Sequence, residues 1–424
     1  MFRVFSKDEN YFLFLTKFKQ LFSIDQYTYD FLMSDSIDID KKKELVSEYE
    51  DSTNEVDSYL SDYSEFHRYG LFLGVSNSCN AMCSYCFASQ GDYGKKRGLM
   101  DKSTAVKSID FFMKKVPNKC EANIIFFGGE PTLAFNTIVQ TCDYIKNKYS
   151  DRNYKLHIVT NATLLNEKMI DFLSDNNFSM GISIDGGEKV QNLQRPLRGG
   201  KSSFYEATKN LNYIFDKMPY VHARGTFSDF NGSLVSAYKD LLELGFKEVS
   251  IPPDLLNYEQ NKEFDKLLNQ LDLLYDFVIE YSQNNDDFPF TVFVESIRRI
   301  FMAKLDIDYT CGVGESIFST DINGDIYPCH RFSSEKEFCM GNVSEVTNLT
   351  SFTYKSTQCK SCWNQYTCSH GCCYNDYFLE KDIKVKNQYW CMYSQKMTEL
   401  SLQLIQNLEY SKIANILGVR WLYE

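Results

Sequence analysis

The stretch SCNAMCSYCF, residues 78–87, determines how the rest of this chain is interpreted. Its three cysteines, Cys79, Cys83 and Cys86, follow the pattern C-x3-C-x2-C directly after an apolar, strand-like run at 71–75. Three thiolates on one short loop can wrap an iron–sulfur cluster, whose usual ligands are Cys thiolates, commonly four. The fourth iron would then be open to a small molecule. A single zinc ion would need a fourth protein ligand, and no His lies close in sequence. Three unconnected buried thiols are the alternative.

The region around this loop alternates between short apolar runs and helical patterns. The apolar runs are 71–75, 123–127, 155–160, 179–184, 223–227 and 248–251, and the helical patterns between them are 104–115, 133–148, 166–176, 204–216 and 234–244. Such alternation is typical of βαβ units and predicts a parallel sheet. We therefore expect an α/β fold in which six strands close into a partial (β/α)6, TIM-like barrel. Functional residues of such barrels lie at the carboxyl ends of the strands.

The first cysteine cluster and the segment after the second strand together resemble the radical SAM enzymes. In that family C-x3-C-x-aromatic-C holds a [4Fe-4S] cluster whose open iron chelates S-adenosylmethionine. Tyr85 occupies the aromatic position, which the family places near the adenine. Gly128, Gly129, Glu130 and Pro131 match the family's GGEP. The glycines permit close backbone approach to a ligand, and the resemblance implies that the Glu130 carboxylate helps to anchor the methionine ammonium.

Further cofactor residues are implied at the ends of the next strands. Asn161 follows the third strand and is similar to the family's T-N-G, with Ala162 in place of the Gly. Ser183 and Asp185 match S-x-D-G, and Arg195 follows ten residues after Asp185. The resemblance implies that Ser183 and Arg195 contact the ribose and carboxylate region of the cofactor. Asp185 has a second interpretation as a turn residue, because Asp-Gly is a strong turn signal.

A second cysteine array lies near the C-terminus. Asn-Gly-Asp at 323–325, between apolar runs, predicts a hairpin that brings Cys311 and Cys329 to neighbouring positions. The spacing resembles the SPASM domain, which carries two auxiliary [4Fe-4S] clusters, although C-x2-C alone would favour zinc. By that resemblance the distal cluster is held by Cys359, Cys362, Cys368 and Cys391, and the proximal one by Cys311, Cys329 and Cys372.

The proximal set lacks one ligand. Some SPASM enzymes have a further Cys shortly after the first, whereas here the segment after Cys311 contains none. The fourth position could be filled by Cys339, by Cys373, by solvent or by a substrate thiolate, and the last option would place a peptide Cys for thioether chemistry. Cys120 and Cys142 match no motif and are expected to be buried thiols.

Composition narrows the class of protein. The chain has 424 residues, enough for two or three domains. A chain of this length can bury a sufficient hydrophobic core, so it does not need disulfide bonds for stability. Its net charge of -12 makes nucleic acid an unlikely main partner. No stretch approaches about 18 apolar residues, so no membrane span is expected, and the charged N-terminus does not read as a signal peptide. We expect a cytoplasmic protein, whose 14 cysteines are better explained by metal ligation than by disulfides.

Four segments are expected along the chain. Residues 1–68 form an acidic α+β lead-in, with a strand-like run at 11–15 and a helical pattern around 22–33. This segment is either a reduced leader-recognition unit or a capping extension. Residues 69–256 form the radical SAM partial barrel, and 257–310 form a helical bridge. Residues 311–424 form the SPASM domain, which ends in a helical pattern at 390–417.

The resemblance implies an enzyme that cleaves S-adenosylmethionine to a 5′-deoxyadenosyl radical and abstracts hydrogen from a ribosomally made precursor peptide, forming a thioether or other crosslink. The expected partners are that peptide and an electron donor such as flavodoxin or ferredoxin. Formylglycine formation, as in anaerobic sulfatase maturation, and peptide epimerisation are alternatives. In the sulfatase branch an Asp usually acts as base at the position of His330, which here is expected to pack beside a cluster. An iron–sulfur redox or scaffold protein is the alternative from another class.

Overall fold

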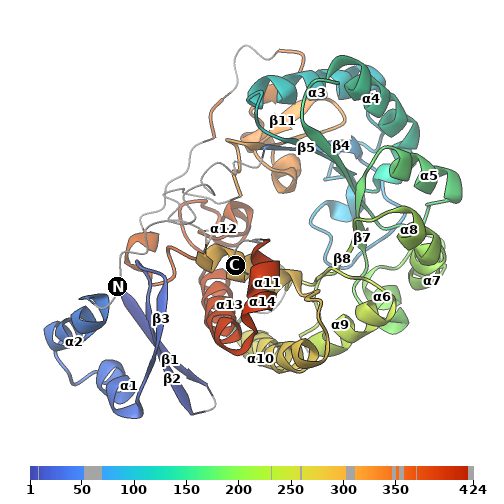
Figure 1. The fold of residues 1–424 in the computed structure, drawn as a ribbon. Helices are drawn as coiled ribbons and strands as arrows, with labels where there is room; N and C mark the ends of the chain where they lie inside the picture. Colours follow the sequence, from blue (N-terminus) through green and yellow to red (C-terminus); the bar gives the residue numbers. More distant parts are fainter. Residues whose placement is uncertain are drawn as a thin grey trace.

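The computed structural model describes residues 1–7, 9–51, 69–230, 232–257, 260–301, 311–345, 350–352, 358–368 and 370–418. Its elements form a curved sheet with helices on its outer side, a group of helices that faces the open side of that curve, and a small N-terminal unit (Figure 1). Among these residues no helix is long and apolar enough to cross a membrane.

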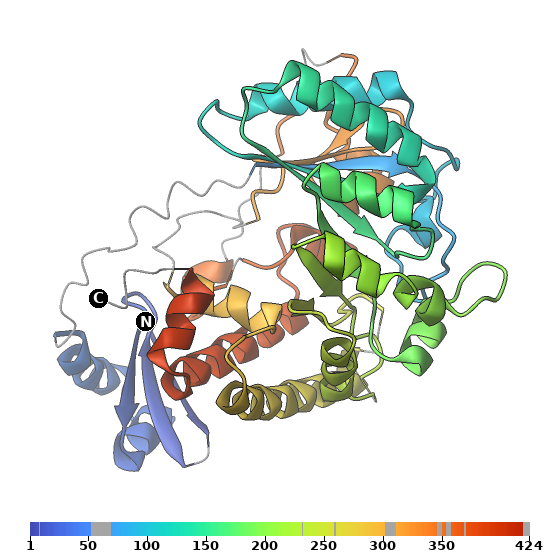
Figure 2. The ribbon, with the colours of Figure 1, turned by 45° about the vertical axis from the view of Figure 1, so that its right-hand side comes forward.

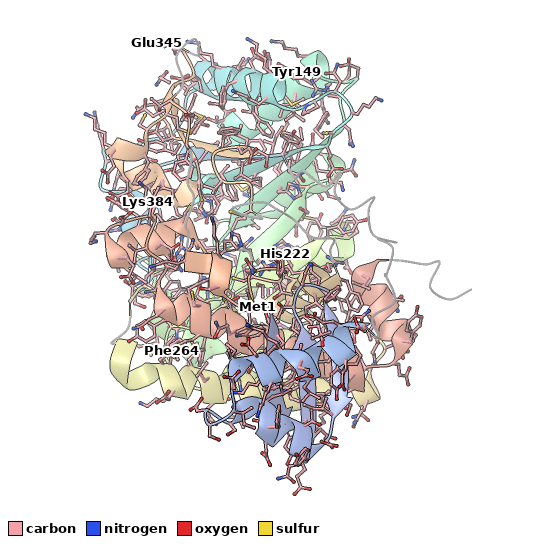
Figure 3. The ribbon with its side chains drawn as sticks, turned by 90° about the vertical axis from the view of Figure 1, so that its left-hand side faces the viewer. Met1, Tyr149, His222, Phe264, Glu345 and Lys384 are labelled. Atoms are coloured by element: carbon pink, nitrogen blue, oxygen red, sulfur yellow. The ribbon has the colours of Figure 1, made fainter. Side chains whose placement is uncertain are left out.

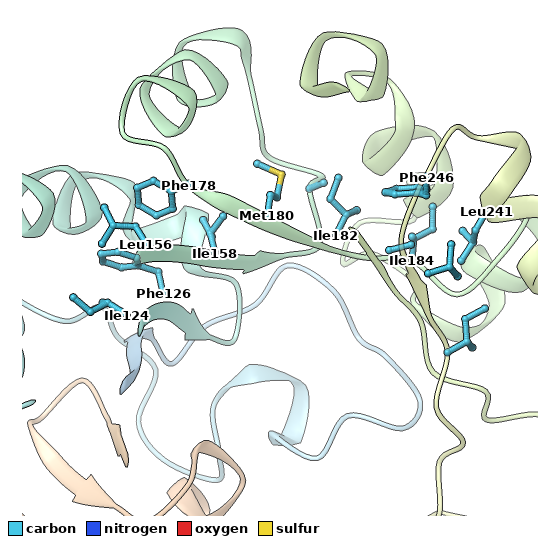
Figure 4. Packing of buried hydrophobic residues seen from close by; sticks show 14 of the residues in the cluster. Ile124, Phe126, Leu156, Ile158, Phe178, Met180, Ile182, Ile184, Leu241 and Phe246 are labelled. Atoms are coloured by element: carbon cyan, nitrogen blue, oxygen red, sulfur yellow. The ribbon is translucent and has the colours of Figure 1, made fainter. Parts of the chain in front are cut away.

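Six parallel strands in sequential order make the predicted partial barrel. They are β4 (Tyr69–Ser76), β5 (Ala122–Gly128), β6 (Tyr154–Thr160), β7 (Ser179–Ser183), β8 (Val221–Arg224) and β9 (Val249–Ser250). Alternate residues such as Ile158, Met180 and Ile182 are buried under the outer helices, whereas the cysteine loop lies across the opposite face (Figure 4). The residues that alternate with these, such as Gly181 and Ser183 on β7, therefore lie on the face that lines the inside of the barrel, because successive residues of a strand face opposite sides.

Most helices of the barrel follow the predicted ranges closely, but the helix at 188–194 lies where none was predicted. The barrel helices are α3 (Lys102–Lys115), α4 (Phe135–Lys148), α5 (Glu167–Asp175), α6 (Glu188–Gln194), α7 (Ser203–Thr208), α8 (Leu211–Lys217) and α9 (Leu234–Glu243). Side-chain caps set several starts, since Asp101 accepts a hydrogen bond from the Thr104 amide and Ser233 accepts one from the Ser236 amide. The single helix predicted at 204–216 is two helices, α7 and α8, broken near Asn210.

The C-terminal region extends the barrel sheet, an arrangement that the sequence did not predict. The predicted hairpin forms β10 (Ile317–Thr320) and β11 (Asp325–Tyr327), and β12 (Gly341–Asn342) follows. β10 pairs in parallel with β4, so the nine-stranded sheet has the order β12-β11-β10-β4-β5-β6-β7-β8-β9. The cysteine-rich region is thus joined to the barrel by backbone hydrogen bonds beside the strand that precedes the first cysteine loop.

Helices close the remaining side of the molecule (Figure 2). They are α10 (Gln260–Asn284), α11 (Thr291–Phe301), α12 (Cys373–Glu380), α13 (Gln388–Asn407) and α14 (Tyr410–Leu417). The predicted terminal helix over 390–417 is in fact α13 and α14, because Leu408 and Glu409 have extended backbone.

The N-terminal unit is an antiparallel sheet followed by two helices. Its elements are β1 (Phe2–Lys7), β2 (Asn10–Leu15), β3 (Gln20–Ile24), α1 (Gln26–Met33) and α2 (Ile39–Asp51). The helix expected around 22–33 is therefore β3 followed by α1. One face of the sheet packs on Leu32 and Val46 of its own helices, and the other packs on Ile300 and Leu402 of α11 and α13. Figure 3 shows this unit beside the C-terminal helices.

Candidate functional site

The cysteine loop is held at the carboxyl edge of the barrel by backbone pairing. The Met82 amide donates to the Pro196 carbonyl at 2.8 Å and the Ser84 amide donates to the Gln194 carbonyl at 3.0 Å, so the loop lies along the segment that carries Arg195. The loop is thereby fixed against the end of β7, where the predicted cofactor residues cluster.

The three thiols of this loop converge in a desolvated position. The pKa of Cys79 is raised to about 12, chiefly by burial and then by the Glu130 carboxylate and the thiols of Cys83 and Cys86. Burial also raises the pKa of Cys83, which the Arg195 guanidinium partly offsets. Thiols of this kind ionise when a cation binds them, because metal ligation requires the thiolate. The donor set fits an iron–sulfur cluster held by Cys79, Cys83 and Cys86.

Glycines let β5 and the cysteine loop approach each other. A side chain at Gly129 would place its Cβ 2.3 Å from the Ser78 carbonyl oxygen, and one at Gly91 would place it 2.5 Å from the Cys79 Cβ. The Gly129 and Glu130 amides donate to the carbonyls of Ser76 and Ser78 at 2.7 and 2.8 Å. In the structure these glycines let the backbone of 76–79 lie directly against the end of β5.

Glu130 lies buried between the ends of β5 and β6. One carboxylate oxygen accepts hydrogen bonds from the Thr132 amide at 3.1 Å and from the hydroxyls of Thr132 and Thr160, both at 2.6 Å. The other accepts from the Asn161 amide at 2.8 Å. Burial raises the pKa of Glu130, and these donors oppose the shift. In the structure this carboxylate fixes two strand ends, a role that the sequence did not indicate. Pro131 begins the 3-10 turn that follows.

A polar network joins β6 to the cysteine loop. The Asn161 side-chain amide donates to the Asn80 side-chain oxygen at 2.9 Å, and the Asn80 amide donates to the Thr163 hydroxyl at 2.8 Å. Ala162, which replaces the family's Gly, has a φ of 59°. The chain therefore keeps the left-handed turn at this position without a glycine, and Asn161 is still aimed at the loop.

Asp185, Arg195 and Tyr85 form a buried triad on the inner side of β7. The Tyr85 hydroxyl donates to Asp185 Oδ2 at 2.5 Å, and Arg195 Nε lies 3.0 Å from the same oxygen. The Arg195 guanidinium also lies 5.3 Å from the centre of the Tyr85 ring. Burial lowers the pKa of Arg195, but the effects of Asp185 and Tyr85 raise it, and the net shift is upward. Asp185 is thus more than a turn residue, because it orients two predicted cofactor residues beside Ser183.

The C-terminal cysteines form two groups. The pKa of Cys329 is raised to about 12, chiefly by burial and in part by the thiols of Cys372 and Cys311. Burial also raises the pKa of Cys373, on which the same three thiols act. The proximal group therefore consists of Cys311, Cys329, Cys372 and Cys373. Both Cys373 and Cys339 pack in the same cluster of side chains as Cys329 and Cys372, and the thiols of Cys372, Cys329 and Cys311 raise the pKa of Cys373.

The distal group is formed by the four cysteines that the spacing implied. Burial raises the pKa of Cys391 to about 12, followed by the effects of Cys368, Cys362 and Cys359. A buried ion pair between Lys386 Nζ and Asp376 Oδ2, 2.9 Å apart, lies beside this group. The same ammonium is the largest electrostatic influence on Cys359 after burial, and it lowers the pKa of that thiol.

The geometry of these groups bears on the kind of metal centre. Within the described part of the chain, no three His, Cys, Asp or Glu side chains are arranged to hold a single metal ion. Each thiolate of an iron–sulfur cluster binds a different iron, so its sulfur ligands lie farther apart than the ligands of one ion.

Two contacts that the sequence did not predict tie the cysteine sites together. Lys95 Nζ, which follows the first cysteine loop, donates to Asp321 Oδ2 and to the Tyr327 hydroxyl in the hairpin, both at 2.8 Å. Arg331 donates to Cys372 Sγ at 3.7 Å and to Asn375 Oδ1 at 2.7 Å. No sequence motif marks either residue, since each acts through a partner more than forty positions away.

His330 packs among aromatic rings at the barrel entrance. Its ring centre lies 4.1 Å from that of Phe72, 4.7 Å from that of Phe127 and 5.7 Å from that of Phe87. Its Nδ1 lies 3.6 Å from Cys329 Sγ. Burial, followed by nearby arginines, lowers its pKa to about 3. The surroundings agree with the packing interpretation of this residue.

Comparison with known proteins identifies the class. The model of the radical SAM superfamily matches residues 73–227, the barrel with its cysteine loop. An uncharacterized protein of Methanocaldococcus jannaschii is 30% identical over 302 residues, which cover 68% of this chain and 93% of that protein. The chain therefore belongs to the radical SAM superfamily.

Relatives with a stated activity are more distant. The cysteine-type anaerobic sulfatase-maturating enzyme of Clostridium perfringens (strain ATCC 13124) is 24% identical over 373 residues, covering 80% of this chain and 97% of that enzyme. The structure of native anSMEcpe with bound AdoMet and the Cp18Cys peptide matches with a TM-score of 0.68 and 22% identity, over 80% of this chain and 98% of that one. The fold is thus that of the anaerobic sulfatase-maturating enzymes, including the cysteine-rich C-terminal region.

Proposed function

We propose that this protein is a radical SAM enzyme that oxidises a residue of a peptide or protein substrate. The observation that carries the proposal is the placement of three thiol groups around one barrel, with the cysteine-rich hairpin paired to the strand that precedes the first cysteine loop. The likeness to anaerobic sulfatase-maturating enzymes, one of which was solved with AdoMet and a peptide, supports a peptide as the substrate.

The residues of this chain have distinct roles in the proposal. Cys79, Cys83 and Cys86 hold a [4Fe-4S] cluster, which with S-adenosylmethionine would supply the electron and the hydrogen-abstracting species. Arg195 is oriented by Asp185 so that its remaining guanidinium nitrogens can bind the cofactor carboxylate. Tyr85, Asn161 and Ser183 line the same edge, where they would position the cofactor.

In this proposal the Glu130 carboxylate binds the cofactor, and the residues around it at 128–131 shape the backbone that carries it. The carboxylate of Glu130 already accepts four hydrogen bonds from the protein, three of them on one oxygen. The second oxygen accepts one, from the Asn161 amide, so it retains capacity for a cofactor ammonium. Gly128, Gly129 and Pro131 shape the turn that presents it.

We further propose two auxiliary [4Fe-4S] clusters. The distal one is held by Cys359, Cys362, Cys368 and Cys391. The proximal one is held by Cys311, Cys329 and Cys372, with Cys373 as the fourth ligand. The grouping of the Cys373 thiol with the other three supports this assignment over ligation by a substrate thiolate. Reduced flavodoxin or ferredoxin is the proposed electron source.

The product is the point on which the relatives and the sequence pattern differ. Formylglycine formation from a peptidyl Cys or Ser is favoured by the sulfatase-maturating relatives of both types. Formation of a thioether or other crosslink in a precursor peptide is the second candidate, and the N-terminal unit favours it. Its edge strand β3 pairs only with β2 among the described strands, and an exposed edge can take an extended leader peptide as an added strand.

Anaerobic turnover with mass spectrometry tests the proposal. The reconstituted protein is incubated with S-adenosylmethionine and dithionite, and then with peptides containing Cys or Ser and with the product of any small neighbouring open reading frame. We expect 5′-deoxyadenosine to form only when the reductant is present. If no 5′-deoxyadenosine forms, the proposal of an enzyme is refuted. Fragmentation then assigns the product, because a crosslink joins two residues whereas formylglycine changes one.

A further inference from the structure

Arg224 is the last residue of β8 and lies inside the barrel. Its register partner on the neighbouring strand is Ser183, and paired residues of adjacent strands share a face of the sheet. Ala223 belongs to the core under the outer helices, so Arg224 points to the opposite, inner face. A side chain at Gly181 would place its Cβ 2.9 Å from Arg224 Cδ, so the glycine makes room for the arginine stem to cross the inner face of β7.

The guanidinium of Arg224 lies between the two parts of the proposed site. It lowers the pKa of His330, which packs against the rings beside the proximal cysteines. It also interacts with Arg195, whose like charge lowers the pKa of Arg224. A substrate that reaches the cofactor from the side of the auxiliary cysteines would pass this position.

Arg224 has no anionic partner at hydrogen-bond distance among the described residues. Asp185 is engaged by Arg195 and Tyr85, and the acid that does act on Arg224 is Glu295, which lies 3.7 Å from Arg299. The side chain is accessible to solvent, yet burial lowers its pKa, a combination expected inside an open barrel. A partly desolvated cation gains from pairing with an anion.

We propose that Arg224 binds a carboxylate of the peptide substrate, either an Asp or Glu side chain near the reacting residue or the peptide's C-terminus. The inference rests on the proposed function, since it names the part of a peptide that the site recognises. A planar carboxylate suits the guanidinium, which can donate two parallel hydrogen bonds to it. Arg195 remains assigned to the cofactor, so the two arginines divide two carboxylates between them.

Binding without turnover tests this assignment. The reconstituted protein with S-adenosylmethionine, but without reductant, is mixed anaerobically with N-acetylated hexapeptide libraries, one with free C-terminal carboxylates and one with C-terminal amides. Bound peptides are identified by mass spectrometry. Four proteins are compared: wild type, Arg224→Gln, Arg224→Lys, and Arg97→Gln as a control that removes the same charge from an exposed side chain.

We expect the wild type and the Arg97→Gln control to enrich carboxylate-bearing peptides about tenfold over their amide counterparts, because a charge-assisted contact contributes a factor of this size. Arg224→Gln should lose the enrichment and Arg224→Lys should keep part of it. Enrichment of acidic side chains in the amide library assigns the carboxylate to Asp or Glu, whereas enrichment confined to free termini assigns it to the C-terminus.

Three results would overturn the inference. They are an absence of carboxylate preference in the wild type, an unchanged preference in Arg224→Gln, and an about tenfold weaker S-adenosylmethionine affinity in Arg224→Gln with peptide selection intact. The last would assign Arg224 to the cofactor. Because selection requires no chemistry, Arg224-dependent enrichment in a protein that forms no 5′-deoxyadenosine would refute the proposed function alone.

Discussion

Removing one partner of the Asp185–Arg195 pair should destabilise the barrel and weaken cofactor binding together. The two side chains are 0% and 12% exposed and their charged atoms lie 3.0 Å apart. Replacing Asp185 by Asn leaves the Arg195 cation buried beside an uncharged amide, which costs about 3–5 kcal/mol for a broken buried pair. The Tyr85 hydroxyl also loses its charged acceptor, although it can accept from the new amide. We therefore expect Asp185→Asn to lower the free energy of unfolding by about 4 kcal/mol.

A double-mutant cycle separates the pair from its surroundings. Arg195→Gln alone leaves the carboxylate without its cation, whereas Asp185→Asn with Arg195→Gln removes both charges. The double variant should therefore be less destabilised than the sum of the single variants, by about 2 kcal/mol. Tyr85→Phe, which removes one hydrogen bond and keeps both charges, is the matched control and should cost about 1–3 kcal/mol.

Anaerobic thermal unfolding at a fixed scan rate measures the four variants. A unit of the size of the barrel shifts its Tm by about 2–4 °C per kcal/mol, so each charge-removing single variant should lower Tm by on the order of 10 °C. Calorimetric titration should show an affinity for S-adenosylmethionine at least about tenfold weaker in both. Additive Tm shifts across the cycle, or unchanged cofactor affinity in Asp185→Asn, would refute the reasoning.

Three further substitutions address separate contacts. Glu130→Gln should cost about 2–4 kcal/mol, because backbone amides point at both carboxylate oxygens and either orientation of the new amide leaves one of them unpaired; a Tm within about 2 °C of wild type would contradict this. Cys373→Ser should lower the iron content of the reconstituted protein and change its electron paramagnetic resonance spectrum, whereas Cys142→Ser, in a buried core position, should change neither; equal iron contents would reject Cys373 as a ligand. Ala162→Val should destabilise by about 2 kcal/mol, since a β-branched residue tolerates a φ of 59° poorly, while Ala162→Gly should stay within about 1 kcal/mol of wild type; reversal of this order in thermal unfolding would exclude backbone strain at this position.

The barrel was predictable from the sequence because its strands are short apolar runs bounded by turn residues, and their order along the chain is their order in space. Residues that act at the end of their own strand, such as Ser183 and Asn161, could therefore be located by motif. The hairpin at 323–325 was predictable for the same reason, as its turn chemistry is local.

The features that were missed depend on long-range packing. The run at 11–15 was predicted as a strand, but its neighbours β1 and β3 were not. β2 is buried on both faces, so its sequence lacks the alternation of apolar and polar residues that would have indicated an antiparallel sheet. The pairing of β10 with β4 joins residues more than 240 positions apart and leaves no mark in either segment. The structural role of Glu130 at two strand ends was not predicted, because its four donors come from residues that look like ordinary turn residues in sequence.

Under the proposed function, these long-range contacts would let one barrel edge serve both cofactor and peptide substrate. The hairpin is fixed to Lys95, which follows the cysteine loop, and to a proximal thiol through Arg331, so these contacts fix the distance between the two proposed cluster sites. A peptide held between them then meets the cofactor from a constant direction, and proximity of this kind lowers the barrier to reaction at one residue of a long chain. Arg224, on the inner face between the two sites, is placed to select which residue that is.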